Sequence, residues 1–379
     1  MDSKLKIMTI FGTRPEAIKM APLVKAIEDD SRFESVVAVT AQHREMLDQV
    51  LNIFDIVPDY DLDIMKNGQT LTDITSRVLS ELDSVINDSK PDIILVHGDT
   101  TTTFAASVAA FYHQIKIGHV EAGLRTWNKY SPFPEEMNRQ LTDVLSDIYF
   151  APTVESKQNL LRENHSEKNI FITGNTAIDA MKYTIDKEYK NEILSENKDK
   201  KIILVTMHRR ENLGSPMVSV FKAINRLIEK FEDIVVIFPI HKNPRVRDLA
   251  DKVLIKSNRI KLIEPLDVVD FHNFASHSYM ILSDSGGVQE EAPSLGVPVL
   301  VLRDTTQRPE GVEAGTLKLV GTDEDTVYME AEKLIVDSAE YEKMSRASNP
   351  YGDGNASLRI LDSIAFDFDI TSNKPIEFK

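Results

Sequence analysis

The sequence predicts two α/β domains, each a doubly wound, Rossmann-like unit built on a parallel sheet. Short apolar runs alternate along the chain with longer stretches that have helical periodicity. The runs are mostly apolar throughout, which is typical of parallel strands that are buried on both faces. At 379 residues the chain is also long enough for two domains. Together these observations favour two doubly wound sheets.

The apolar runs fall into two series, one in each half of the chain. In the first half the expected strands are 7–10, 36–39, 93–96, 117–120 and 148–150, with helices such as 15–29 and 71–87 between them. In the second half the expected strands are 202–205, 234–238, 260–263, 280–282 and 297–302. The stretch 186–200 is polar, so we expect the domains to be 1–185 and 186–379. The segment 356–368 has Leu358, Leu361, Ile364, Ala365 and Phe368 at helical spacing, and this helix could pack back on the N-terminal domain.

Composition narrows the class of protein. The net charge of -16 argues against a nucleic acid or an anionic membrane as the main partner. The absence of cysteine excludes disulfides, thiolate nucleophiles and zinc–sulfur sites. No run approaches 18 apolar residues, and the first six residues lack the apolar core of a signal peptide. We therefore expect a cytoplasmic enzyme with no membrane span.

The most informative segment is 283–293, which follows an expected strand and leads into an expected helix. Gly286 and Gly287 allow a close approach to a ligand and leave N–H groups at a helix start, which suits a phosphate. Glu290 and Glu291 follow one turn later, and carboxylates suit the hydroxyls of a ribose. The pattern predicts a nucleotide site, although a tight turn without any ligand would also explain the two glycines.

Basic side chains follow other expected strands. Arg14 and Lys19 lie near a helix start, where cations are unfavourable unless they face an anion; a surface charge pair with Glu16 is the alternative. His208 and Arg308 also come after expected strands, His208 directly before two arginines. Because ligands of open α/β sheets bind beyond the carboxyl ends of the strands, we expect a cleft between the two domains to hold an anionic ligand.

Acidic side chains in the first half complete the set. Asp99 is expected to cap a helix that starts with four threonines, and those hydroxyls would line a polar pocket. Glu121 lies beside an apolar sheet, so we expect desolvation to raise its pKa, as proton transfer at neutral pH requires. A salt bridge from Glu121 to Arg125 is the alternative.

Two adjacent acids begin another expected helix. Glu135 and Glu136 fall in its first turn, where the helix dipole favours carboxylates, so one of them needs no functional explanation. Glu135 and Arg139 have the spacing of an i,i+4 ion pair.

No cofactor is indicated by these motifs. The glycine pattern of a dinucleotide-binding turn is missing after Gly12, so a nicotinamide cofactor is not supported. Metal-ligand spacings are missing too; Asp99, Glu121 and Glu135 could hold Mg²⁺, but a basic cleft can neutralise a diphosphate directly. Several acids around a nucleotide diphosphate suit reaction at a sugar carbon, either glycosyl transfer or isomerisation by acid–base chemistry.

The ordered motifs resemble those of the bacterial, non-hydrolysing UDP-N-acetylglucosamine 2-epimerases. The resemblance runs from about residue 5 to 365 and includes segments 12–16, 97–100, 119–125, 134–139, 208–212, 285–291 and 303–306. It implies two Rossmann-like domains facing a cleft, as in glycosyltransferases of the B fold, and a homodimer. It also implies reversible conversion of UDP-GlcNAc to UDP-ManNAc by anti elimination of UDP to 2-acetamidoglucal and re-addition, without a cofactor.

The resemblance assigns roles to single positions. It implies that the catalytic residues are Asp99, Glu121, Glu135 and His208, and that UDP is bound by Arg14, Lys19, Leu266, Phe271, Ser285, Gly286, Gly287, Glu291 and Arg308. Only a backbone contact is inferred for Leu266. A second site, for activation by UDP-GlcNAc, is implied at Gln42, His43, Arg209 and His241, with Glu135 shared. Glu45 and Gly68 replace a glutamine and an arginine of some relatives, which predicts weaker activation.

Three other functions remain open on the sequence. A hydrolysing relative would release ManNAc and UDP, and a glycosyltransferase of the same fold would need an acceptor. A sugar-nucleotide-binding regulator would have lost catalysis, which the presence of all four implied catalytic residues argues against. For an epimerase, the expected use of the product is a cell-envelope polysaccharide such as teichoic acid or capsule.

Overall fold

The computed structural model describes residues 4–42, 44–66, 68–306 and 308–379, with Arg210 described by its backbone alone. The chain forms two compact units. Unit 1 comprises Met1–Tyr183 and Gly352–Lys379, and unit 2 comprises Thr184–Tyr351. The first crossing lies close to the expected boundary at 185. The chain returns to unit 1 at Gly352, so the end of the expected domain 186–379 belongs to unit 1, as the sequence allowed for the helix at 356–368.

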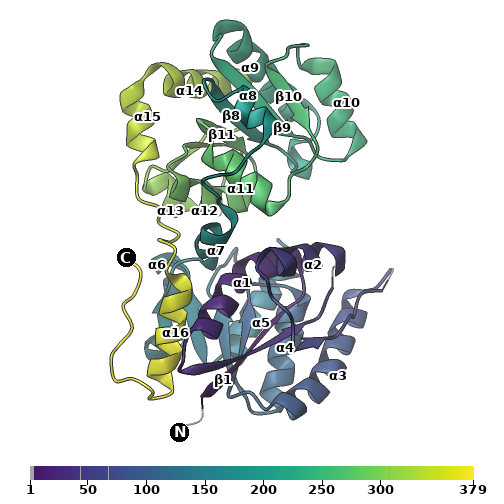
Figure 1. The fold of residues 1–379 in the computed structure, drawn as a ribbon, viewed down its shortest axis with the longest axis vertical. Helices are drawn as coiled ribbons and strands as arrows, with labels where there is room; N and C mark the ends of the chain where they lie inside the picture. Colours follow the sequence, from purple (N-terminus) through teal and green to yellow (C-terminus); the bar gives the residue numbers. More distant parts are fainter. Residues whose placement is uncertain (1–3, 43, 67, 307) are drawn as a thin grey trace. The chain divides into compact units, whose positions relative to one another are not determined.

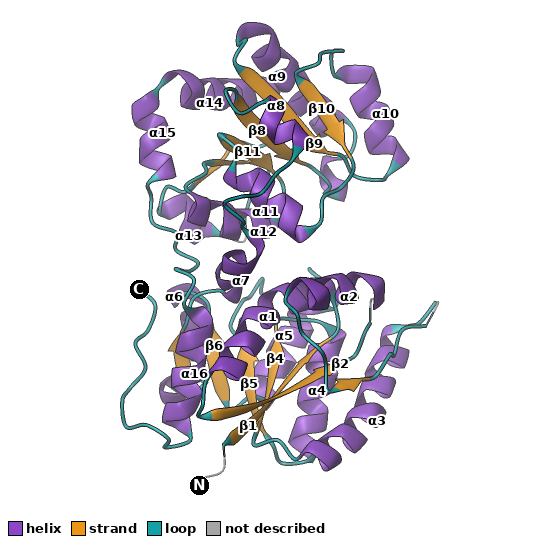
Figure 2. Cartoon of the chain, viewed as in Figure 1, coloured by secondary structure: helices purple, strands orange, loops and turns teal. Residues whose placement is uncertain are grey.

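Unit 1 is built on a seven-stranded parallel sheet in the order β3-β2-β1-β4-β5-β6-β7. Its strands are β1 Leu5–Phe11, β2 Phe33–Val39, β3 Tyr60–Asp61, β4 Ile93–His97, β5 Lys116–Val120, β6 Ile148–Ala151 and β7 Ile170–Ile172. Its helices are α1 Arg14–Asp29, α2 Arg44–Ile53, α3 Leu71–Ser89, α4 Thr101–Tyr112, α5 Glu135–Leu145, α6 Val154–Arg162, α7 Thr176–Thr184 and α16 Ala356–Asp367, with a 3₁₀ turn at Glu167–Asn169. Figure 2 shows these helices flanking the strands.

Unit 2 repeats the plan with a six-stranded parallel sheet in the order β10-β9-β8-β11-β12-β13. Its strands are β8 Lys201–Thr206, β9 Ile234–Pro239, β10 Ile260–Ile263, β11 Met280–Ser283, β12 Val299–Val301 and β13 Leu317–Leu319. Its helices are α8 Glu192–Glu196, α9 Ser215–Lys230, α10 Pro244–Val253, α11 Val268–Ser276, α12 Gly286–Glu291, α13 Pro309–Glu313, α14 Glu324–Val336 and α15 Ser338–Ser345, with 3₁₀ turns at Arg210–Asn212 and Ala292–Leu295. The predicted fold class, two doubly wound α/β units, is confirmed.

Both sheets are buried on two faces, as the apolar strand sequences predict. In β1, Ile7 and Phe11 join one core cluster of unit 1, whereas Met8 and Ile10 join the cluster on the other face. This follows from the two-residue period of a strand. Unit 2 has the same arrangement around β8. Because all neighbouring strands within each sheet are parallel, their carboxyl ends lie on one edge, where the polar motifs follow.

Helix α16 belongs to unit 1. Ile360, Leu361 and Ile364 are fully or almost fully buried and join the core cluster beneath α1. Figure 1 shows α16, in yellow, beside α1. Leu358 was expected on the buried face but is 55% exposed, and the buried face of this helix begins with Ala356 and Ile360 instead. None of the helices in the described residues is long and apolar enough to cross a membrane.

We predict that Ile364→Ala lowers the free energy of unfolding by about 2–5 kcal/mol, because a fully buried side chain leaves a cavity. Leu358→Ala on the same helix is the matched control and should change it by less than about 0.5 kcal/mol. Urea unfolding followed by circular dichroism measures both. Equal effects of the two substitutions would contradict the packing of α16 described here.

Candidate functional site

The turn after β1 is held by a buried carboxyl group. Glu16 accepts hydrogen bonds from the backbone N–H groups of Gly12 and Thr13, at 3.1 and 2.8 Å, and from the Thr13 hydroxyl at 2.7 Å. Its other oxygen accepts from the hydroxyls of Thr100 and Thr103, at 2.6 and 3.1 Å. Since these threonines follow β4, Glu16 joins two loops at the carboxyl edge of the sheet. Glu16 is therefore not the surface partner of Arg14 that the sequence left open.

The threonine run before α4 is mostly structural. Thr100, and not Asp99, is the N-cap of α4, and its hydroxyl accepts from the Thr103 N–H at 3.1 Å. Thr102 and Thr103 are fully buried, whereas Thr100 and Thr101 line the cavity described below, so the expectation that several of these hydroxyls line a pocket holds for two of the four residues. The capping prediction for Asp99 is also wrong, and its carboxylate pairs with Arg139 instead.

The two acids that begin α5 have different surroundings. Glu136 is fully buried and accepts from the backbone N–H groups of Thr126 and Trp127, both at 2.9 Å, so it fixes the preceding loop. Glu135 has an oxygen, Oε2, that is buried and has no hydrogen-bond partner among the described residues. Arg139 contacts Asp99 and, at 3.5 Å, Glu136, so the expected Glu135–Arg139 pair is not formed.

A cavity of about 470 Å³ collects several predicted residues of unit 1. It is lined by Thr13, Arg14, Pro15, Gln42, Met46, Leu71, Asp99, Thr100, Thr101, Pro134, Glu135 and Asn138. Arg14 forms no ion pair with any residue that the structure describes, so its charge is available to a ligand. Two acids and an uncompensated arginine in one cavity suit an anionic ligand that undergoes proton transfer.

Glu121 directly follows β5, and its own backbone φ is 65°. Its Oε2 is paired with the Lys19 ammonium group and accepts from Asn175 Nδ2 at 3.0 Å, and His97 Nε2 lies 3.6 Å away. Burial alone would raise the pKa of Glu121, but Lys19 and then His97 outweigh it, so its pKa lies well below the usual value. The prediction of a raised pKa is therefore wrong, because the sequence did not reveal these partners.

Arg125 has other partners than Glu121. Its guanidinium group pairs with the fully buried Asp143 at 2.5 Å and with Glu163 at 2.6 Å. Asp143 also accepts from His119 Nδ1 at 2.6 Å. The alternative of a Glu121–Arg125 salt bridge is thus wrong.

In unit 2 the loop after β8 is organised by Asp284, which is fully buried. Its carboxylate accepts from the backbone N–H groups of His208 and Arg209, at 3.1 and 2.9 Å, and from Asn212 Nδ2 at 3.0 Å. His208 Nδ1 lies 3.3 Å from Asp284, and the imidazole is 47% exposed. Asp284 therefore orients His208 and leaves the rest of its ring open to a ligand.

The turn after β11 has the predicted form. Ser285 is the N-cap of α12, and Gly286 and Gly287 begin the helix. A Cβ atom at Gly286 would lie 3.1 Å from the guanidinium carbon of Arg308, so a side chain there would displace that group. Arg308 is held by Glu290, with Nε 2.9 Å from the carboxylate. The guanidinium group of Arg308 thus lies beside the start of α12, as an anion site requires.

The second acid of this segment, Glu291, is oriented by a buried histidine. His272 Nε2 lies 3.3 Å from Glu291 Oε2, and His272 Nδ1 lies 2.6 Å from the Thr184 hydroxyl. Leu266 and Phe271 are partly buried against the core of unit 2. The residues predicted to hold a nucleoside on unit 2 therefore come from α11, α12 and the loop before α11.

The residues predicted for a second ligand site are only partly placed. Gln42 accepts from the Thr102 hydroxyl at 3.3 Å and lines the unit 1 cavity, whereas His43 lies outside the described residues. Arg209 is held through its backbone by Asp284. His241 is exposed, and its Nδ1 accepts from the Asn243 N–H at 3.0 Å.

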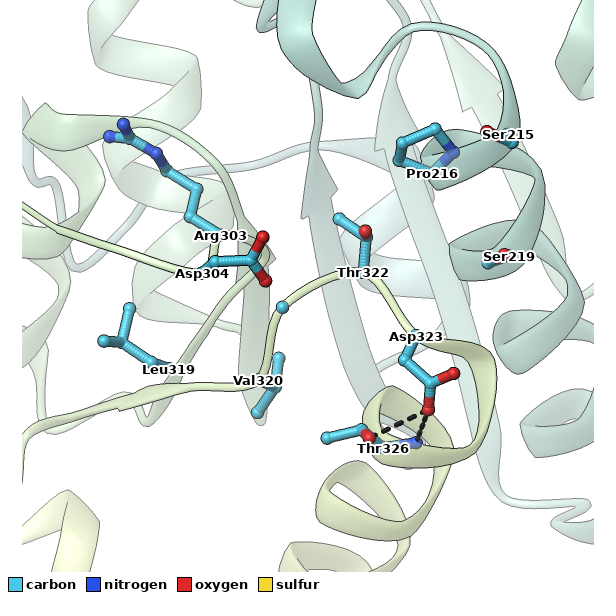
Figure 3. A pocket seen from close by; sticks show the side chains of 11 residues that line it. Ser215, Pro216, Ser219, Arg303, Asp304, Leu319, Val320, Thr322, Asp323 and Thr326 are labelled. Atoms are coloured by element: carbon cyan, nitrogen blue, oxygen red, sulfur yellow. Dashed lines mark hydrogen bonds between the residues drawn. The ribbon is translucent and has the colours of Figure 1, made fainter.

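A further cavity of about 610 Å³ lies on unit 2. Figure 3 shows it between the start of α9, at Ser215, and the segments that follow β12 and β13, with Arg303 and Asp304 on one side. Asp323 there accepts hydrogen bonds from Thr326 and caps α14. None of the residues predicted to bind UDP lines this cavity, so we do not count it as part of the candidate site.

Sequence reasoning missed the residues that hold the site in place. These are Glu16, His97, Glu136, Asn175, His272 and Asp284. His97 and Asp284 stand inside the motifs, so their position after a strand was a usable signal. Asn175 and His272 gave no such signal. No group of acids and histidines within the described residues has the arrangement of a metal site.

We predict that Glu136→Gln lowers the free energy of unfolding by about 1–3 kcal/mol, because an amide cannot accept from both backbone N–H groups. Glu135→Gln is the matched control, and its free energy of unfolding should not fall, because the oxygen it changes has no protein partner. Chemical denaturation of both variants checks this. A loss in Glu135→Gln as large as in Glu136→Gln would contradict the distinction.

Comparisons with known proteins identify the family of this chain. Residues 25–365 match the family model described as UDP-N-acetylglucosamine 2-epimerase. The UDP-N-acetylglucosamine 2-epimerase of Bacillus subtilis is 61% identical over 99% of both chains. The structure of an S. aureus protein solved with UDP is 58% identical with a TM-score of 0.90, covering 99% of this chain and 100% of that one.

A UDP-GlcNAc 2-epimerase of Neisseria meningitidis, solved with UDP-GlcNAc, is 50% identical with a TM-score of 0.84, over 95% of this chain and 99% of that one. A rhamnosyltransferase that is 12% identical, with a TM-score of 0.57, shares the fold alone. All the motifs except segment 12–16 lie within the residues that the family model matches. The chain belongs to the UDP-N-acetylglucosamine 2-epimerase family of isomerases.

Proposed function

We propose that this chain interconverts UDP-GlcNAc and UDP-ManNAc without releasing the sugar, as a non-hydrolysing UDP-N-acetylglucosamine 2-epimerase. The observation that carries the proposal is the cavity of unit 1, where Asp99, Glu135 and the uncompensated Arg14 meet at the carboxyl edge of the sheet. Membership of the epimerase family supports the same substrate. This set of side chains can bind an anionic ligand and transfer protons.

The reaction we propose is an anti elimination followed by re-addition. A carboxylate removes the proton from C2, the electrons of that C–H bond form the C1–C2 double bond, and the C1–O bond breaks with its electron pair on the β-phosphate. This gives UDP and 2-acetamidoglucal. A carboxylic acid then returns a proton to C2 from the other face while UDP attacks C1. No electron is gained or lost overall, so the chemistry needs no redox cofactor.

The acids of unit 1 are the candidates for the two proton transfers. Glu121 is suited to be the base, because its lowered pKa keeps it ionised at neutral pH. Asp99 is the candidate for the other face, held by Arg139 beside the cavity. Which of the two serves which face is left open. Glu135 lines the same cavity, and its buried Oε2 has no hydrogen-bond partner among the described residues.

Unit 2 supplies the groups suited to UDP. The start of α12 and Arg308 are the proposed phosphate ligands of unit 2, and Arg14 is the proposed anion ligand of unit 1. Lys19, also expected near UDP, is paired with Glu121 in this structure. Glu291 is the proposed acceptor for the ribose hydroxyls, since its carboxylate is oriented by His272. Phe271 and the backbone at Leu266 would bound the uracil, and His208 would stabilise the departing β-phosphate.

We further propose a cytoplasmic homodimer whose product feeds a cell-envelope polysaccharide such as teichoic acid or capsule. Relatives with UDP-GlcNAc bound support the nucleotide sugar as ligand. For the proposed activator site, Glu45 is exposed, and Gly68 adds neither charge nor side chain. Activation by UDP-GlcNAc is therefore expected to be retained but weak.

Turnover of UDP-GlcNAc in deuterated water is expected to place deuterium at C2 of both epimers, without net release of UDP. Solvent exchange at C2 follows because the proton leaves the sugar in the intermediate. Mass spectrometry and phosphorus NMR measure the two quantities. Accumulation of free UDP and ManNAc would indicate the hydrolysing reaction, and inactivity without an added acceptor would indicate a glycosyltransferase.

Glu121→Gln should lose at least about 100-fold in kcat. Full turnover by this variant would refute the catalytic role of Glu121.

Starting from pure UDP-ManNAc, we expect a slow initial rate that added UDP-GlcNAc raises. Glu45→Gln should lower the UDP-GlcNAc concentration needed for activation by up to about fivefold. It removes a negative charge, and the interaction of an exposed charge with another charge contributes up to about 1 kcal/mol. Coupled measurement of initial rates checks both. A full initial rate with no trace of UDP-GlcNAc would contradict the activation.

A further inference from the structure

The backbone at Glu121 is in an unusual conformation. Its φ of 65° is in the left-handed region, which is unfavourable for a non-glycine residue and persists where the surroundings require it. The residue directly follows β5, and its side chain is only 11% exposed. This strain indicates that the direction of the Glu121 side chain is itself important.

Donors from three separate elements meet one oxygen of this carboxylate. Lys19 of α1 pairs with Oε2, and Asn175, from the loop before α7, donates to Oε2 at 3.0 Å. The Asn175 amide is itself fixed, because its oxygen accepts from the Ala177 N–H at 2.9 Å. His97, at the end of β4, places Nε2 at 3.6 Å from the same Oε2.

The Nε2 atom of His97 is not used by any other hydrogen bond among the described residues. The side chain is buried, and Nε2 has no hydrogen-bond partner within the described residues. A buried donor without a partner is costly, and the carboxylate it faces is Glu121. His97 is therefore placed to become the third donor on Oε2 with a small movement.

The other oxygen, Oε1, accepts no hydrogen bond from any residue in the described part of the chain. A Cβ atom at Gly98 would lie 3.8 Å from Oε1, in ordinary van der Waals contact. The two oxygens of Glu121 are thus unlike each other, because donors meet Oε2 and none of the described residues donates to Oε1.

We propose that His97 and Asn175 are positioning residues which, with Lys19, hold Oε2 of Glu121 so that Oε1 exchanges the C2 proton. This rests on the proposed epimerase function and adds which oxygen reacts and what aims it. In the transfer the C2–H bond breaks and an Oε1–H bond forms, while Oε2 keeps its donors. The charged and titratable groups that face Glu121 are Lys19 from α1 and His97 from β4; Asn175 adds a neutral amide.

The electrostatics agree with the geometry. Burial opposes the ionised form of Glu121, whereas Lys19 and His97 favour it more strongly and lower its pKa. A base must be ionised to act, so activity is retained down to the lowered pKa and is lost below it. Removing a donor raises the pKa and should move the acidic limb of the pH profile to higher pH.

The test compares His97→Phe and Asn175→Leu, which keep the shape of each side chain and remove its donor. We expect kcat to fall about 10- to 100-fold, KM to change less than about threefold, and the acidic limb of kcat/KM to move to higher pH. His97→Gln retains an N–H donor and should recover part of the lost kcat. His165→Phe is the control, because His165 also has a buried Nε2 without a hydrogen bond to any described residue, but its ring packs against Tyr149, with ring centroids 4.7 Å apart.

The outcomes separate this inference from the proposed function. If both variants keep the kcat and the acidic limb of the pH profile of the wild-type protein, the positioning role is overturned. The epimerase function is left intact by that result. Equal losses in His165→Phe would also overturn it, because burial alone would then explain the effect. A wild-type protein that never exchanges the C2 proton would overturn the proposed function, and the inference with it. If His97→Phe does not fold, Asn175→Leu and His97→Gln decide the question by the same criteria.

Discussion

The hydrogen bonds accepted by the buried Glu16 carboxyl group are the interaction on which the catalytic edge of unit 1 depends. They tie the turn after β1, with Gly12 and Thr13, to the start of α4, with Thr100 and Thr103. A Cβ atom at Gly12 would lie 1.9 Å from the Thr40 hydroxyl, so the turn can come this close only with glycine. Arg14 and Asp99 are each next to one of these loops. Their common cavity therefore depends on a carboxyl group that does not itself line it.

Unit 2 uses the same device with a different residue. Asp284 gathers the backbone N–H groups of His208 and Arg209, so the loop after β8 and the turn after β11 are fixed together. In both units a buried acid satisfies N–H groups that an irregular loop would otherwise leave unpaired, which would be costly in the interior. The loops can then present their other side chains to a ligand without depending on it for their shape.

Neighbouring acids have separate tasks because donors reach them unequally. Glu136 accepts hydrogen bonds from backbone N–H groups, and Glu290 accepts from Arg308. In contrast, Glu135 lines a cavity and Glu291 contacts a histidine. Glu121 shows the same principle within one carboxylate, since Lys19 and Asn175 both meet Oε2. Its lowered pKa suits a base that is ionised before substrate binds, and not a group held neutral by burial.

The sequence by itself determined the two parallel sheets, the longer strands and helices, the strand-end position of the motifs and the epimerase family. Apolar runs and motif order carry that information locally. The two- and three-residue strands β3, β7 and β13 were missed because so few residues show no period, and the return of α16 to unit 1 depends on contacts with α1. Only the tertiary structure decided the partners of Glu121, Asp99 and Glu135. Their donors come from segments far apart in the chain, and the sign of a pKa shift depends on which charges those segments bring together.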